Sequence, residues 1–347
     1  MAAQPHRVVR PVRAGDVDAL YELAEALGPG MTTLPADRDT IAGKLDASLK
    51  SFAGRLRPED AQYLLALEDL DSGRVDGIAA VYPSVGAPHG FFSYKVSRLT
   101  RRSRQLDRRL DVELLTLAND YTGATEVGSL AVRPQLRGSG AGRLLARSRY
   151  MLIAAFPDLF APRVMAEMRG WQDADGRSPF WDAVGARFFH MDFPTADRLS
   201  AVEGAEFIAE LMPTHPIYAD MLPEAARRAI GRPHASSAVA MAMLLEEGFR
   251  HEQLVDVFDA GPQVHVERDR IRTVSENRLV RAQAGRGREG RPLLVSTTDL
   301  ETFRVAQAFA DAGDETLEAP DRVWRALGLT TGAAVRWAPS HAKILPL

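Results

Sequence analysis

The sequence predicts an α+β protein, and three stretches carry that prediction. Residues 127–132 form an apolar run that Arg133-Pro134 ends, and glycines then lead into an amphipathic helix over 143–155. The stretch "QYLLALEDLDSGRVDGIAAVY" holds two apolar runs joined by Asp71-Ser72-Gly73, which is typical of a β-hairpin. Beyond Val264 the chain turns to short β-rich pieces, which predict a small β-rich C-terminal domain, a barrel or a sheet.

The composition fits a globular protein of two or three domains. The chain has 347 residues, of which 46% are hydrophobic, and a mean hydropathy of −0.18. No run approaches the roughly 18 apolar residues that a membrane span needs, and "MAAQPHRVVRPV" lacks the apolar core of a signal peptide. We therefore expect a cytoplasmic protein with no membrane partner.

Cysteine count and charge exclude further classes. The chain has no cysteine, which excludes disulfides, a thiolate nucleophile and any Cys-based metal site, and no metal site is predicted. The net charge is −3 with both signs interspersed, so no global field favours nucleic acid. Residues 98–109 hold six arginines, but Asp107 interrupts them and no aromatic residue is interleaved for base stacking. A solvated or intersubunit face is the favoured interpretation, with a nucleic-acid site as the alternative.

The first elements follow a simple order. Residues 8–12 form a short strand, Asp16 is a good N-cap for a helix that ends near Leu27, and residues 41–52 form a second helix before the hairpin. After the helix over 143–155 comes a buried strand over 163–170.

A pattern of helix, glycine, phenylalanine and strand is predicted twice. Ser178 caps a short helix with Pro179 at its first position, and this helix ends at Gly185 before an aromatic strand. A later helix runs from Ser236 to Gly248 and is followed by another strand. The recurrence favours two related half-domains over 1–195 and 196–264, followed by the C-terminal domain over 265–347. The alternative is that any helix ending at a glycine before a strand gives this pattern.

The stretch "SLAVRPQLRGSGAGRLL" has the properties of an anion cradle. Gly138, Gly140 and Gly142 let a loop bring its N–H groups together, and the helix that follows adds partial positive charge at its first turn. The spacing excludes a nucleotide P-loop and a dinucleotide fingerprint. An ordinary strand-to-helix turn is the alternative. The stretch resembles the acyl-CoA loop of GNAT acyltransferases, whose Q/R-x-x-G-x-G/A pattern matches Arg137, Gly140 and Gly142.

Acyl transfer from a thioester to an amine needs a hold on CoA, a donor to the carbonyl oxygen and a proton acceptor. The backbone N–H groups around Leu130, Ala131 and Val132 could pair with the pantetheine and polarise the thioester, with the pyrophosphate on residues 138–142.

Two histidines are the main candidates for proton transfer. His234 stands at a loop-to-helix junction where Ser236 could set its tautomer, although a plain capping role is open. His215 is bracketed by Pro213 and Pro216, which suggests a structural turn.

Carboxylates in apolar surroundings are the other candidates. Glu167 lies between Ala166 and Met168, and Glu210 lies between Ala209 and Leu211. Each should have a partner because a buried carboxylate is costly. Arg169 is the expected partner for Glu167, unless a cationic acceptor takes that place.

The chain closely resembles the bacterial arginine N-succinyltransferases over nearly its whole length. The stretches that carry the resemblance occur in the same order and are "GMTTLPADRDTIAGKLDASLKSF", "NDYTGATEVGSLAVRPQLRGSGAGRLLARSRYMLIAAF", "AEMRG", "SPFWDAVGARFFHMDF", "FIAELMPTHPIY", "IGRPHASSAVAMAMLLEEGFR" and "DVFDAGP". The resemblance implies a GNAT-like fold and transfer of succinyl from succinyl-CoA to the α-amine of L-arginine in arginine catabolism.

In that family the histidine matching His234 acts in proton transfer, and the leucine matching Leu130 contacts succinyl-CoA. Candidate substrate ligands are Asn119, Asp120, Glu167, Arg169 and Glu210. The alternatives are a related acyltransferase that uses ornithine, another amine or another acyl donor, and a catalytically silent acyl-CoA-binding subunit. A homo- or hetero-oligomer is expected.

Overall fold

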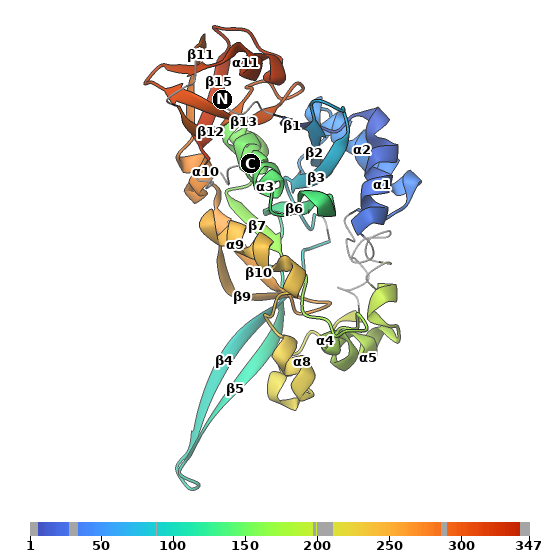
Figure 1. Cartoon of the computed structure of the whole chain (residues 1–347). Coiled ribbons are helices and arrows are strands. Elements are labelled where there is room, and N and C mark those ends of the chain that lie inside the picture. Colours follow the sequence, from blue (N-terminus) through green and yellow to red (C-terminus); the bar gives the residue numbers. More distant parts are fainter. Residues whose placement is uncertain are drawn as a thin grey trace. The chain divides into compact units, whose positions relative to one another are not determined.

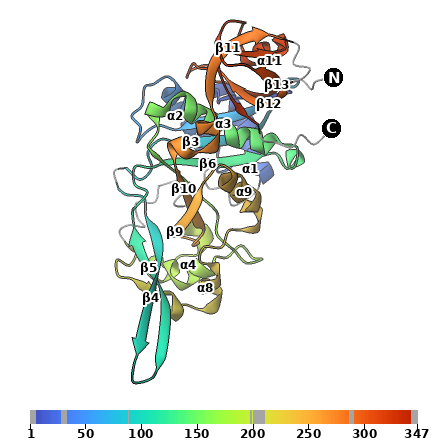
Figure 2. The same ribbon diagram turned by 90° about the vertical axis from the view of Figure 1, so that its left-hand side faces the viewer.

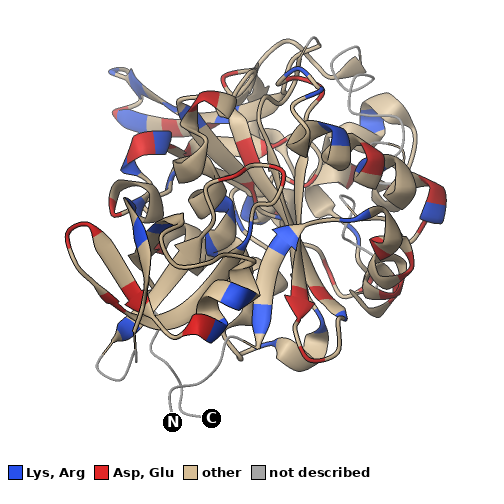
Figure 3. Cartoon of the chain, turned by 90° about the horizontal axis from the view of Figure 1, so that it is seen from above, with Lys and Arg blue, Asp and Glu red and all other residues tan. Residues whose placement is uncertain are grey.

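The computed structural model describes residues 6–27, 34–87, 89–196, 199, 211–285 and 290–340. The chain divides into two compact units, each made of segments that are discontinuous in sequence. Unit 1 contains Met1–Pro83, Thr125–Pro162 and Glu267–Leu347, and unit 2 contains Ser84–Ala124 and Arg163–Val266. Positive and negative side chains alternate along the elements of both units (Figure 3).

Unit 1 begins with the element order that the sequence predicts. The elements are β1 (Arg7–Pro11), α1 (Val17–Leu27), α2 (Arg38–Phe52), β2 (Tyr63–Asp69), β3 (Val75–Tyr82), β6 (Thr125–Val132) and α3 (Ala141–Ala155). The strands pair antiparallel in the order β1-β2-β3-β6. The hairpin of β2 and β3 turns at Asp71-Ser72-Gly73 as predicted, and the side chain of Asp37 caps α2.

Helices cover both faces of this sheet (Figure 1). Leu20 and Leu23 of α1 and Ile41 and Leu45 of α2 are buried against alternate residues of β2 and β3, among them Ile78. α3, most of whose residues are buried, packs on the other face (Figures 1 and 2). The predicted helix cap at Asp16 has a different role, because its carboxylate accepts the Arg13 N–H and pairs with Arg10 at 2.7 Å.

The last part of unit 1 is a small barrel. Its elements are α10 (Arg272–Ser275), β11 (Arg278–Ala284), β12 (Arg291–Ser296), β13 (Val305–Ala312), β14 (Thr316–Ala319), α11 (Asp321–Leu327) and β15 (Ala334–Pro339). The five strands follow the order β12-β15-β11-β14-β13, and β12 also pairs with β13, which closes the ring. Trp324, Leu293 and Val335 are buried in its core.

Unit 2 is built on a six-stranded arrangement with short helices. Its elements are β4 (Ser93–Ser103), β5 (Arg108–Ala118), β7 (Arg163–Glu167), α4 (Pro179–Ala183), α5 (Gly185–Phe189), β8 (Ile217–Tyr218), α8 (Glu224–Ala229), α9 (Ala238–Glu246), β9 (Arg250–Asp256) and β10 (Pro262–Glu267). The strands lie in the order β7-β10-β9-β4-β5-β8. β4 and β5 form a long ribbon that runs out beyond the other elements of this unit (Figure 1).

One prediction about unit 2 needs correction. The aromatic strand expected after Gly185 is wrong, because Gly185–Phe189 is the helix α5. The Phe189 ring stacks on Trp181 at 5.4 Å, and a Cβ on Gly185 would lie 2.2 Å from Trp181 Cε3, so this segment packs against one ring instead of alternating. The arginine-rich stretch 98–109, predicted to be a solvated or intersubunit face, belongs to the β4–β5 ribbon, where most of its residues are exposed. The second pattern is confirmed, because Gly248 and Phe249 link α9 to β9.

No helix in these described ranges is long and apolar enough to cross a membrane.

Candidate functional site

A β-bulge interrupts the pairing of β6 with β3. Ile78 is opposite Ala131 and Ala80 is opposite Gly128, so the two residues Ser129 and Leu130 face a single residue of β3. Ser129 has a left-handed φ of +51°, which is unusual for a residue other than glycine. Its hydroxyl lies 2.9 Å from the Tyr82 hydroxyl oxygen. The bulge re-aims the backbone at the point where the sequence predicts contact with pantetheine.

The glycine loop lies directly after this strand, and α3 begins at its end. Arg137, Gly138 and Gly140 are exposed, and both glycines adopt positive φ values of +81° and +84°. A Cβ on either of them would meet nothing within 4 Å, so open space surrounds the turn. Gly142 lies inside α3, where a Cβ would only touch Val132 at 3.9 Å. The first turn of α3 therefore presents N–H groups beside an exposed loop, which is suitable for phosphate.

Polar side chains gather on the β6 face that α2 covers. Glu126 is opposite Tyr82 in the register, two residues before Gly128, and a Cβ on Gly128 would lie 3.1 Å from its Oε1. Burial raises the pKa of Glu126 to about 7, against the opposing effect of Arg149 and Lys44. Burial also lowers the pKa of Lys44 in α2 and raises that of Tyr82 to about 12. Sequence reasoning missed Glu126, although a lone carboxylate in an apolar strand was the same signal that singled out Glu167.

In unit 2, His234 stands at the junction that the sequence predicts. It precedes the short turn Ala235–Ser237 that leads into α9. Its Nδ1 accepts the Ser236 backbone N–H at 3.2 Å and lies 2.7 Å from Ser236 Oγ. Because a backbone N–H can only donate, the neutral ring carries its proton on Nε2. Burial, and then the charge of Arg169, lower the pKa of His234 below its ordinary value, so the ring is neutral at pH 7.

The backbone around His234 is fixed by a neighbouring segment. The His234 N–H donates to the Arg169 carbonyl at 2.8 Å, and Gly170 forms a β-bridge with Pro233. The buried Asp259 carboxylate then accepts the Gly170 N–H at 2.7 Å and the Gly261 N–H at 2.8 Å. Burial, followed by the Asp256 carboxylate, raises the pKa of Asp259 to about 8. Asp259 thus holds in place the strand to which His234 is attached.

The other candidate substrate ligands are spread over unit 2. Glu167 accepts from Gln263 Nε2 at 2.6 Å, while Arg169 donates to Gln172 Oε1, so the predicted Glu167–Arg169 ion pair is wrong. Each side chain takes an amide partner because the chain turns after Glu167, where β7 ends. Asn119 and Asp120 are exposed at the end of β5, and Asp120 pairs with Lys95 at 3.3 Å.

Glu210 lies outside the described residues. The other histidine candidate, His215, is exposed, so its proline-bracketed turn does not bury the ring.

A buried histidine was overlooked. Charged neighbours in the sequence do not favour His265 as a site residue. In the structure it is only 7% exposed and lies in β10. Its Nδ1 lies 2.8 Å from the Tyr121 hydroxyl and its Nε2 lies 3.4 Å from a Glu252 carboxylate oxygen. Alternation could not have revealed it, because His265 lies on the opposite face of β10 from Val264 and Val266, and β10 is buried on both faces.

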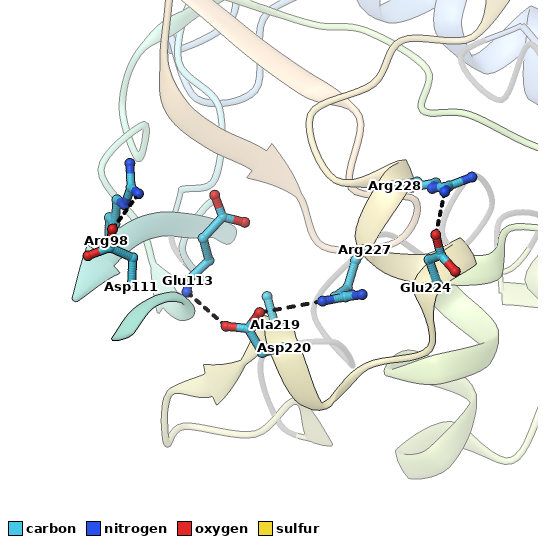
Figure 4. A pocket seen from close by; sticks show the side chains of 8 residues that line it. All are labelled: Arg98, Asp111, Glu113, Ala219, Asp220, Glu224, Arg227 and Arg228. Carbon is cyan, nitrogen blue, oxygen red and sulfur yellow. Dashed lines mark hydrogen bonds and ion pairs between the residues drawn. The ribbon is translucent and has the colours of Figure 1, made fainter. Parts of the chain in front are cut away.

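A pocket also lies beside the base of the β4–β5 ribbon, but its charges are paired. Arg98 meets Asp111 at 2.7 Å, Arg227 meets Asp220 at 3.4 Å, and Arg228 pairs with Glu224 (Figure 4). Because these side chains form ion pairs with one another, few charges of the lining remain to bind a ligand. The residues that line it are Arg98, Asp111, Glu113, Ala219, Asp220, Glu224, Arg227 and Arg228.

Comparison with known proteins gives one consistent result. The model of the family "Arginine N-succinyltransferase beta subunit" matches residues 7–273, and that of its C-terminal domain matches residues 276–339. The arginine N-succinyltransferase subunit beta of Pseudomonas aeruginosa is 41% identical over 337 residues, which are 97% of this chain and 99% of that protein. The arginine N-succinyltransferase of Salmonella paratyphi B is 41% identical over 307 residues, 88% of this chain and 89% of the relative.

Among solved structures, the arginine/ornithine succinyltransferase subunit AI from Pseudomonas aeruginosa matches with a TM-score of 0.88 and 31% sequence identity. The match covers 98% of this chain and all of that chain. The similarity therefore spans both units and the C-terminal barrel.

Proposed function

Because this chain belongs to the arginine N-succinyltransferase family, we propose that it transfers the succinyl group of succinyl-CoA to the α-amine of L-arginine. The chain is an acyltransferase, and the observation that carries the specific reaction is the full-length similarity to proteins that bear this name. In the fold, the bulge of β6 followed by the glycine loop and α3 supports acyl-CoA as the donor.

In unit 1, the backbone performs the donor chemistry of this proposal. Arg137 and the N–H groups of residues 138–142 hold the pyrophosphate. The N–H groups around Leu130, Ala131 and Val132 pair with the pantetheine and polarise the thioester carbonyl, because the bulge at Ser129 directs backbone groups away from β3. This arrangement needs no covalent nucleophile.

In unit 2, His234 is the proposed residue for proton transfer. The acceptor ammonium first loses a proton, its nitrogen forms a bond to the thioester carbon, and the C–S bond breaks. The second proton of the nitrogen passes to the sulfur, which leaves as a thiol, so the reaction releases one proton, the first one lost by the ammonium. A neutral ring with its proton on Nε2 can stabilise developing negative charge by donating a hydrogen bond. The Ser236 contact supports this role over that of a base at Nε2.

The test of the proposed function is direct. Succinyl-CoA and L-arginine incubated with the protein should release free CoA and give a product heavier by one succinyl group. The absence of product at millimolar arginine would contradict the proposal. Tight binding of CoA without turnover would instead support a silent acyl-CoA-binding subunit.

Ornithine is a second candidate acceptor, because the subunit AI structure bears the name arginine/ornithine succinyltransferase. A matrix of kcat/KM values for arginine and ornithine with succinyl-CoA and acetyl-CoA separates the two acceptors and the two donors.

An oligomer is also part of the proposal. The names "subunit beta" and "subunit AI" of the two Pseudomonas proteins support an assembly of chains. The side chains of Leu106 and Leu110, 71% and 59% exposed on the β4–β5 ribbon, offer apolar contact surface. Light scattering on the purified chain would measure its mass.

A further inference from the structure

Two opposite charges in unit 1 face the same space without a described partner. Glu126 lies on β6 with Gly128 and opposite Tyr82 of β3, on the sheet face that α2 covers, and Lys44 lies in the middle of α2. Both side chains are half-buried. In the part of the chain that the structure describes, neither the Glu126 carboxylate nor the Lys44 ammonium makes a hydrogen bond or an ion pair. Buried charge of this kind is costly.

One buried charge of the same unit is paired with two carboxylates. Arg10 is 3% exposed, and its guanidinium meets Asp16 at 2.7 Å and Glu68 at 2.6 Å. The contrast shows that this fold can pair a buried charge where the charge serves stability. Lys44 and Glu126 are therefore placed for a different purpose.

The electrostatics of the pair agree with this geometry. Each charge stabilises the other, since Glu126 raises the pKa of Lys44 and Lys44 lowers that of Glu126, but in both cases burial has the larger, opposite effect. Arg149 from α3 contributes charge to Glu126 as well. A ligand with one positive and one negative group would stabilise both side chains at once.

The position of the pair ties it to the acyl group. The Glu126 carboxylate lies directly over Gly128, because a Cβ there would lie only 3.1 Å from Oε1 and 3.4 Å from Tyr82 Cε2. The next residue is the left-handed Ser129 of the bulge, where the thioester is expected to lie. An amine held by Glu126 thus lies on the same strand as the backbone N–H groups that would polarise its target, which begin four residues later at Leu130.

We propose that Lys44 and Glu126 form a dipolar subsite that binds the α-carboxylate and the α-ammonium of an amino-acid acceptor. This inference rests on the proposed function and assigns residues to it. Glu126 takes the first proton from the ammonium, and Lys44 makes the enzyme select acceptors that carry a carboxylate next to the amine.

The test compares arginine with argininamide, which keeps the α-amine and the side chain but replaces the carboxylate with a neutral amide. Wild type should prefer arginine at least tenfold in kcat/KM. The Lys44→Met variant should lose about tenfold or more with arginine, change little with argininamide, and keep its KM for succinyl-CoA within twofold. Lys50→Met is the matched control, because Lys50 lies on the same helix, 50% exposed and paired with Asp46.

Glu126→Gln keeps the shape of the side chain and removes its charge. It should lower kcat/KM for arginine at least tenfold. In wild type, kcat/KM for arginine should fall as the pH drops below about 7, where Glu126 takes up a proton. In Glu126→Gln this fall in kcat/KM should be absent. The groups that face Glu126 and share this titration are Lys44, Arg149 and Tyr82.

Three outcomes would overturn the inference. Lys44→Met could show the same kinetics as Lys50→Met, or its kcat/KM could fall equally for arginine and for argininamide. It could also abolish the preference for succinyl-CoA over acetyl-CoA, which would assign Lys44 to the carboxylate of the donor. The proposed function fails separately, when wild type itself gives no succinylated arginine. Urea unfolding of each variant shows whether a loss comes from the fold.

Discussion

At the scale of single residues, His234 is the proposed site residue whose hydrogen bonds define its tautomer. Replacing it with alanine removes the Nε2 donor, and loss of a positioned acid or base typically costs about 10² to 10⁴ in rate. We expect His234→Ala to lower kcat at least a hundredfold and to leave the KM for succinyl-CoA within a few fold, because the phosphates bind to unit 1. Steady-state kinetics with both substrates varied would measure this.

His215→Ala is the matched control for that variant. His215 is an exposed histidine of the same unit, so its loss should change neither kcat nor stability appreciably. Near-normal kcat in His234→Ala would return His234 to a capping role at the start of α9.

Gly140 tests the loop through its backbone conformation. Its φ of +84° disfavours any side chain by about 1–2 kcal/mol, although no protein atom blocks a Cβ. Gly140→Val should therefore raise the KM for succinyl-CoA at least tenfold while the protein stays folded. Gly332→Val is the control, because Gly332 has a φ of +87°, equally open surroundings and a place in the C-terminal barrel. An equal KM in both variants would make the loop an ordinary turn.

At the scale of elements, the segment that holds His234 depends on Asp259. Removing its carboxyl group leaves two buried N–H groups unpaired, and each buried donor left without a partner costs about 1–3 kcal/mol. We expect Asp259→Ala to lower the free energy of unfolding by roughly 3 kcal/mol or more in urea titrations. Asp173→Ala, which affects an exposed loop carboxylate of the same unit, should lower it much less.

The pH dependence of stability gives Asp259 a second readout. Its pKa is raised in the folded state, so between about pH 4 and pH 8 the folded chain holds a proton that the unfolded chain has released. This group therefore makes the folded state progressively less stable as the pH rises through that window. Asp259→Asn should flatten the decline measured by urea unfolding from pH 6 to pH 9, and an unchanged slope would contradict the raised pKa.

Secondary-structure elements could be predicted from the sequence where neighbouring residues determine the backbone conformation. Asp71-Ser72-Gly73 and the Ser178-Pro179 helix start specify their own backbone conformation, because caps and turns depend on neighbouring residues. The helix after Gly185 was not predictable in this way. Its conformation depends on the stacking of Phe189 on Trp181, a contact between side chains that alternation does not encode.

At the scale of the whole molecule, the β4–β5 ribbon is long but contributes little to the core. Leu99 is opposite Val112, and the residues beyond this pair are mostly exposed. Joining Leu99 to Val112 with Asn-Gly should change the free energy of unfolding by less than about 1 kcal/mol, because an isolated ribbon is marginal in water. Cutting back further, to remove the fully buried Leu115, should destabilise unit 2 strongly.

The chain with the shortened β4–β5 ribbon also tests whether the ribbon forms a contact between chains. Light scattering before and after the shorter truncation compares the masses of the two proteins. A lower mass would place the ribbon in a contact between chains, and an equal mass would leave it a solvated arm.

The candidate site was predictable only in the parts that sequence motifs mark. The glycine loop and His234 lie in short conspicuous stretches, whereas Lys44 and Glu126 are 82 positions apart and meet only when α2 covers the sheet. Asp259 could not be predicted from the sequence for the same reason, since its partners Gly170 and Gly261 become neighbours through the pairing of strands.

The bulge in β6 also changes how the sequence of this strand must be counted. Glu126 and Gly128 share a face with Ala131, which is an odd number of residues away, because Ser129 adds one residue to the alternation. A strict two-residue period through position 129 would assign Glu126 to the face of Val132, towards α3. The one inserted residue thus shifts the alternation of β6 by one position. This shift places the Glu126 carboxylate on the sheet face where Lys44 lies.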